Sequence, residues 1–126
     1  MKPPDSTVPT PAPLDGQALQ DYITSLEQLH DLLDDGFWAA TTIEAKDAIN
    51  ELSQAVFEIL TTLEQQTIES ATPEYVALKG TVDAVNAKLQ IVQGQINAWI
   101  HKIELANQVA EAIAQAVALA AKVFAL

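Results

Sequence analysis

The feature that most constrains this chain is an apolar seam that runs from Tyr75 to Phe124 without a slip. An apolar residue recurs there in alternating steps of three and four for seven heptads. A 3.5-residue period of this length is typical of helices that pack side by side in coiled-coil fashion. Gly80 and Gly94 lie away from the seam, so we expect one long helix over residues 73–126. The seam consists of Tyr75, Leu78, Val82, Val85, Leu89, Val92, Ile96, Trp99, Ile103, Ala106, Ala110, Ile113, Val117, Ala120 and Phe124.

Two shorter helices are expected before this long one. Apolar residues with the same spacing predict helices over about residues 15–35 and 42–70. Gly36 is expected to end the first of them as the residue just past the helix. Thr72 and Pro73 form a strong start signal for the long helix, because threonine caps a helix and proline favours its first position.

The first thirteen residues read as an extended arm. They hold five of the six prolines, and such a proline-rich sequence favours polyproline conformation. The arm has no apolar run of the kind that a Sec signal peptide needs. The sequence therefore predicts an all-α protein with an extended Pro-rich arm over 1–13 and a helical bundle over 14–126. It is expected to be cytoplasmic, or exported without a Sec signal peptide.

The long helix is expected to outreach its neighbours. A helix over 42–70 that folds back antiparallel covers residues 73–101 and leaves 102–126 bare, an overhang of roughly 37 Å. Most positions beyond residue 100 are apolar, which is typical of a helix buried on several sides. Either the chain bends near His101 and Lys102 to close a four-helix bundle, or a second chain or lipid covers the overhang. Because no glycine or proline marks a bend there, we expect a partner.

The predicted mechanism is helix-to-helix docking through the apolar residues of the overhang. Replacing Ile113 with Asp is then expected to dissolve the assembly while residues 1–101 stay helical. Phe37 and Trp38, in a predicted turn, form either a partner-facing aromatic patch or the lid of the bundle end. The predicted interface consists of Ile103, Leu105, Ala106, Ala110, Ala112, Ile113, Val117, Leu119, Ala120 and Phe124.

Charge is distributed unevenly along the chain. Seventeen acidic residues against six lysines, with no arginine, give a net charge of −11, which repels nucleic-acid phosphates. Residues 1–72 carry thirteen of the acids and two lysines, whereas residues 73–126 carry four of each. The sequence therefore argues against nucleic-acid binding. It leaves open an acidic immunity protein or chaperone whose first half binds a basic partner.

Candidate catalytic and metal-binding residues are sparse. Glu27 and His30 have the Glu-x-x-His spacing of helical di-iron sites, and His101 and Glu104 repeat it in reverse. A di-iron site needs two further inward carboxylates, which the pattern does not supply. The chain has no cysteine, phosphate-binding glycine loop or nucleophile elbow. We therefore expect no enzymatic activity, cofactor, metal or small-molecule substrate.

Helices rich in Ala, Gln and Val, with long heptads and no arginine, resemble bacterial helical secretion substrates, granule-coating phasins and helical pore-forming components. The resemblance rests on composition and covers mainly residues 73–126. It implies a helical interaction or assembly protein that docks against itself or another helical protein. The alternative is a membrane-active or hydrophobic-surface-binding protein that uses the same helix against lipid.

Overall fold

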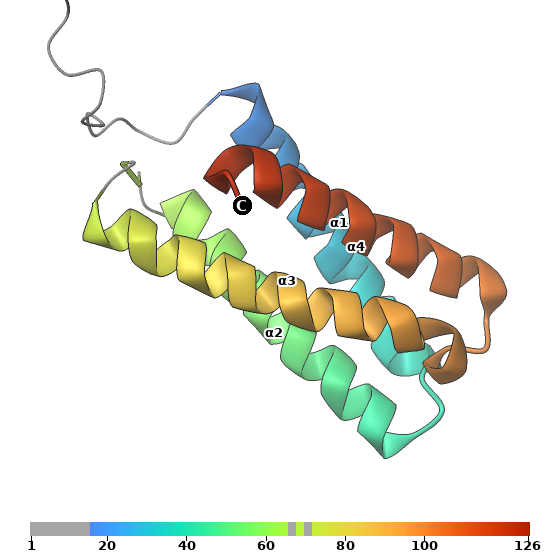
Figure 1. The fold of residues 1–126 in the computed structure, drawn as a ribbon. Helices are drawn as coiled ribbons and strands as arrows, with labels where there is room; N and C mark the ends of the chain where they lie inside the picture. Colours follow the sequence, from blue (N-terminus) through green and yellow to red (C-terminus); the bar gives the residue numbers. More distant parts are fainter. Residues whose placement is uncertain (1–15, 66–67, 70–71) are drawn as a thin grey trace, which may run out of the picture.

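The computed structural model describes residues 16–65, 68–69 and 72–126 of the 126-residue chain. Within these ranges the chain forms four helices that lie side by side as a bundle (Figure 1). The expectation of an all-α protein is confirmed. The predicted arm over 1–13 lies outside the described residues. The helices are α1 (Gln17–Ala39), α2 (Ile43–Gln65), α3 (Pro73–Trp99) and α4 (Ile103–Phe124).

Each helix runs antiparallel to the next, and each packs against two neighbours. Helix α1 contacts α2 and α4, and α3 contacts the same two helices. This arrangement places α1 and α3 at opposite corners of the bundle. Because short connections join successive antiparallel helices, the topology is the simple up-and-down form.

The single helix predicted over 73–126 is wrong. It is divided at Ile100, His101 and Lys102 into α3 and α4, and the bundle has four helices instead of three. Helix α4 turns back and packs between α1 and α3. Residues 102–126 therefore have an intramolecular partner, contrary to the expectation of a bare overhang.

Burial of apolar surface explains why the chain bends without a glycine or proline. Ile113 and Phe124 are both completely buried in the folded chain, and each such side chain contributes roughly 1.5–3 kcal/mol. Interrupting a helix over three residues costs about 1 kcal/mol for each backbone hydrogen bond lost. Folding α4 back onto α1 and α3 is therefore the more stable arrangement for an isolated chain.

The starts of α2 and α3 follow the local sequence closely. Thr72 caps α3 as predicted: its hydroxyl accepts a hydrogen bond from the Tyr75 N–H at 3.2 Å, and Pro73 takes the first position. At the start of α2 the hydroxyl of Thr42 accepts from the Ala45 N–H at 3.1 Å. Both caps supply acceptors for N–H groups that lack helical partners.

The predicted helix ends are less accurate. Helix α1 continues through Gly36 to Ala39, so the expectation that Gly36 ends the helix is wrong. Helix α2 stops at Gln65, about one turn earlier than expected. The extension of α1 is stabilised by Lys46, whose Nζ donates to the Phe37 carbonyl at 2.7 Å, since a cation is favourable at a helix C-terminus.

Candidate interaction surface

Most of the predicted docking residues lie inside the bundle. Of this set only Ile103 is well exposed, with 74% of its surface accessible. The remaining residues face α1 and α3, where they form the core or its margin. Buried are Ala106, Ala112, Ile113, Ala120 and Phe124, and half-buried are Leu105, Ala110, Val117 and Leu119.

One end of the bundle carries both the α1–α2 connection and the link between α3 and α4, and we call it the closed end. Ala40 and Ile100 form an isolated antiparallel bridge across it. The Thr41 N–H donates to the Trp99 carbonyl at 3.3 Å. Ile100 is 1% exposed. These contacts tie the two connections together and fix the direction in which α4 leaves α3.

Three of the most exposed large apolar side chains belong to this same closed end. Trp38 in the last turn of α1 is 74% exposed, and Ile43 at the start of α2 is 78% exposed. Ile103 opens α4. We call these three residues the closed-end surface. Single exposed apolar residues are ordinary, whereas these three large ones lie at the same end of the bundle.

The two residues of the aromatic pair predicted as a patch or a lid differ in burial. Phe37 is half-buried, and its ring lies 4.9 Å from the Nζ of Lys46. Trp38 contacts Phe37 edge to face, with the ring centroids 5.2 Å apart, and points into solvent. Phe37 therefore packs against the core, and Trp38 extends from it.

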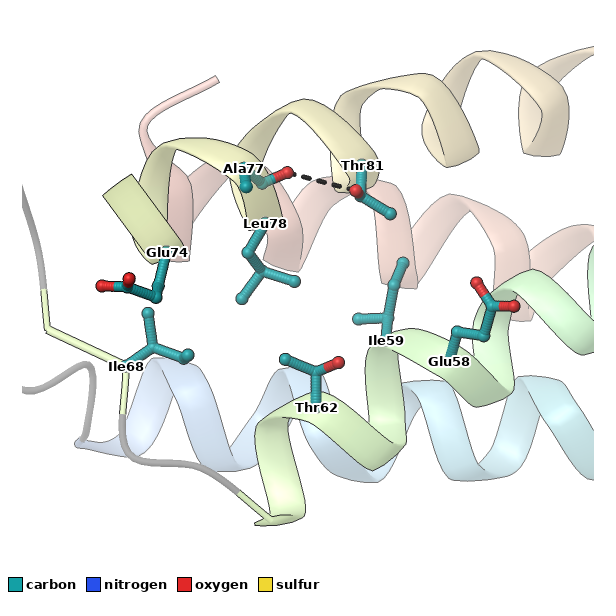
Figure 2. A pocket seen from close by; sticks show the side chains of 8 residues that line it. All are labelled: Glu58, Ile59, Thr62, Ile68, Glu74, Ala77, Leu78 and Thr81. Carbon is teal, nitrogen blue, oxygen red and sulfur yellow. Dashed lines mark hydrogen bonds between the residues drawn. The ribbon is translucent and has the colours of Figure 1, made fainter. Parts of the chain in front are cut away.

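A hollow of about 250 Å³ lies at the opposite end, between α2 and α3. Figure 2 shows Ile59 and Leu78 directed into it, with Glu58 and Glu74 at its rim. Both carboxylates are exposed. The hydroxyl of Thr81, which also lines the hollow, donates to the Ala77 carbonyl of its own helix at 3.1 Å. The hollow combines an apolar floor with a solvated acidic rim. These lining residues do not place a nucleophile beside a base.

The Glu-x-x-His pair of the sequence analysis does not assemble into a metal centre. Among the residues that the structure describes, no group of three or more His, Asp or Glu side chains is placed to hold a metal ion. His30 instead lies against the ring of Phe57, with centroids 5.5 Å apart. His101 is exposed in the link between α3 and α4.

The sequence pattern predicts two of the three residues of the closed-end surface as interaction residues. Trp38 was predicted within an aromatic pair, and Ile103 was predicted as a docking residue. Ile43 was missed. Its signal was its place between Thr42 and Glu44: an apolar residue in a polar first turn is off the seam and has no core position to occupy.

None of the four described helices combines the length and apolarity needed to span a bilayer. Comparisons with protein-family models, with curated proteins and with solved structures found no match for this chain.

Proposed function

We propose that the protein is a non-enzymatic assembly protein that binds a second copy of itself at the closed end of the bundle. The observation that carries this proposal is the shared location of Trp38, Ile43 and Ile103, which come from three helices and are each more than 70% exposed. Burial of large apolar side chains is the main driving force of association. Tryptophan in particular is enriched among residues that dominate binding energy.

The uneven charge distribution bears on the strength of this association. Residues 73–126 carry four acids and four lysines, whereas residues 1–72 hold the whole net charge of −11. Two of the three closed-end residues, Trp38 and Ile43, belong to the acidic half, so the apolar contact has to outweigh a repulsion that salt screens. The apolar face of α4 is used within the bundle, so we propose a protein partner in preference to lipid.

The test is the mass of the protein in solution over a range of concentrations, measured by light scattering behind a sizing column. We expect the wild type to move from one copy of 13.6 kDa to two copies as concentration rises. The double variant Trp38→Ser, Ile43→Ser should weaken this association by about tenfold or more, because each interface residue of this kind contributes over ~1 kcal/mol. Both positions are exposed, so the fold should persist.

The matched control is Val76→Ser. Val76 is 64% exposed in the first turn of α3, at the end of the bundle away from the closed end. This variant loses a comparable apolar side chain and should keep wild-type association. A wild type that stays at one copy at every concentration contradicts the proposal. Equal weakening by the control and the double variant does the same.

A second candidate function is the binding of a basic protein by the acidic half of the chain. It is favoured by the exposure of Asp31, Asp34 and Asp35 on α1 and of Glu44 and Glu51 on α2. Binding of this kind weakens steeply with salt, because the charges are solvent-exposed. Association of two copies through apolar residues should instead persist in high salt.

A further inference from the structure

The apolar seam continues through the link between α3 and α4, although the helix does not. Ile96, Trp99, Ile103 and Ala106 keep the steps of three, four and three. In the folded chain Ile96 and Ala106 are fully buried, whereas Trp99 is half-buried and Ile103 is 74% exposed. The bend therefore removes from the core the two seam residues that flank it.

The link itself contains no helix-breaking residue. It consists of Ile100, His101 and Lys102, and each of these can continue a helix. Lys102, the N-cap residue just before α4, makes no side-chain hydrogen bond to the helix. Ile100, just after α3, has extended backbone and not the left-handed conformation that often ends a helix. The bend depends on tertiary contacts: the Ala40–Ile100 bridge, the hydrogen bond to the Trp99 carbonyl and the burial of Ile100.

The contacts of α4 with the rest of the bundle do not depend on the link. The Phe124 ring lies 6.0 Å from that of Tyr22 on α1 and 5.9 Å from that of Tyr75 on α3. The Gln93 amide donates to the Ala110 carbonyl at 3.1 Å. An α4 from another copy offers the same side chains to the same groove, since every copy has the same sequence.

We propose that two copies exchange α4, so that α3 and α4 of each chain fuse into one helix over 73–124 whose second half packs in the partner's bundle. The inference rests on the proposed self-association and gives its mechanism. Straightening the link adds helical hydrogen bonds and returns Trp99 and Ile103 to the seam, near the twofold axis between the copies. A hinge as short as this three-residue link is the kind of connection at which helices are exchanged between copies.

The helices that the two copies exchange come from the half of the chain without net charge. The two long helices of the exchanged dimer cross through residues 73–126, which carry no net charge. The contacts that it gives up are the Ala40–Ile100 bridge, the hydrogen bond from the Thr41 N–H to the Trp99 carbonyl and the burial of Ile100. Because closure within one chain has no concentration dependence, the exchanged form is favoured as protein concentration rises.

Distance within one chain tests the exchange directly. The chain has no cysteine, so Val76→Cys and Leu126→Cys, both at exposed positions, accept a donor and an acceptor dye. In the closed chain these positions flank Tyr75 and Phe124, whose rings are 5.9 Å apart. In a fused helix they are roughly 75 Å apart at 1.5 Å per residue. Energy transfer should therefore be high in the closed chain and nearly absent after exchange.

The doubly labelled chain is unfolded in urea, mixed with a large excess of unlabelled chain and refolded at high concentration. The excess ensures that a labelled chain pairs with an unlabelled one, so transfer reports one chain only. The sizing column then separates monomer from dimer. We expect high transfer in the monomer fraction and loss of transfer in the dimer fraction.

A variant pair at the start of α4 supplies the second test. Ile103→Pro suits the closed chain, because residue 103 is the first of α4 and Lys102 before it is extended. Proline inside the fused helix breaks it, so the dissociation constant of the dimer should rise by about 100-fold or more. Ile103→Ala removes the same apolar side chain but allows the fused helix, and should weaken the dimer by only about tenfold.

The outcomes separate the two proposals. A dimer that retains full energy transfer overturns the exchange and leaves self-association through the closed end standing. Equal effects of Ile103→Pro and Ile103→Ala also overturn the exchange, since only the proline variant forbids a continuous helix. A chain that remains monomeric at every concentration overturns both.

Discussion

Among single residues, the buried Tyr22 makes the stability of the fold depend on pH. It is 1% exposed, and burial raises the pKa of its phenol above the ordinary value of 10.0. The folded state therefore prefers the protonated form. The stability from this preference is complete below about pH 10 and falls as pH rises further, by up to about 1.4 kcal/mol per pH unit.

We expect Tyr22→Phe to reduce this alkaline loss of stability. The free energy of unfolding, from urea titrations at about pH 9 and about pH 11, should fall less in the variant than in the wild type. Tyr75→Phe is the control, because Tyr75 is only half-buried, with its hydroxyl 3.4 Å from the Phe124 carbonyl. An unchanged pH dependence in Tyr22→Phe contradicts the argument.

Gly36 illustrates a residue whose role depends on a distant neighbour. A Cβ at this position lies 3.0 Å from Cδ1 of Ile100, which is itself 1% exposed and has little room to move. We expect Gly36→Ala to destabilise the protein by about 1 kcal/mol in urea denaturation, since overpacking outweighs the gain in helix propensity.

Two matched variants and a rescue check this reason. A Cβ at Gly80 or Gly94 meets nothing within 4 Å, so alanine there should stabilise by about 1 kcal/mol. Ile100→Val removes the crowded methyl group, so it should lessen the cost of Gly36→Ala. If the single variant Gly36→Ala instead stabilises the protein, Ile100 can move aside and the overpacking argument is contradicted.

At the scale of elements, the start of α4 lacks a side-chain cap. Lys102 is its N-cap residue and makes no side-chain hydrogen bond. Asp at an N-cap accepts from the first-turn N–H groups and suits the positive end of the helix. We expect Lys102→Asp to be more stable than Lys102→Ala by about 1 kcal/mol in thermal and urea unfolding. Equal stability of the two variants contradicts the cap assignment.

The elements also show which boundaries are encoded locally. Thr72 and Pro73 start α3 as predicted, because an N-cap hydroxyl and a proline act within one turn of the helix. The end of α1 differs from the prediction because its last turn responds to a neighbour, Lys46 of α2. A boundary set by side chains from another helix leaves no signature in its own sequence.

At the scale of the whole molecule, the structure changes the expected result of altering Ile113. Its side chain is completely buried between α4 and the rest of the core. We expect Ile113→Ala to lower the free energy of unfolding by about 2–5 kcal/mol, with all four helices unfolding together. The expectation that a change here leaves residues 1–101 folded is therefore replaced by cooperative loss of the bundle.

Urea denaturation followed by circular dichroism and by tryptophan fluorescence checks this prediction. Ile91→Ala is the control, because Ile91 is 67% exposed on α3 and should cost less than about 0.5 kcal/mol. Separate transitions for helicity and for fluorescence in Ile113→Ala would show that α4 unfolds independently, contrary to a single core.

The sequence by itself determined the all-α class, the apolar face of each helix and the start of α3, because periodicity and caps are local properties. It also pointed to Trp38 and Ile103. The division of the long seam at residues 100–102 was decided only by tertiary structure. A continuous helix and a bent one have the same apolar pattern, and the choice follows from the burial of α4 between α1 and α3. The bend places Ile103 at the same end as Trp38 and Ile43, so the candidate surface exists only in the folded chain.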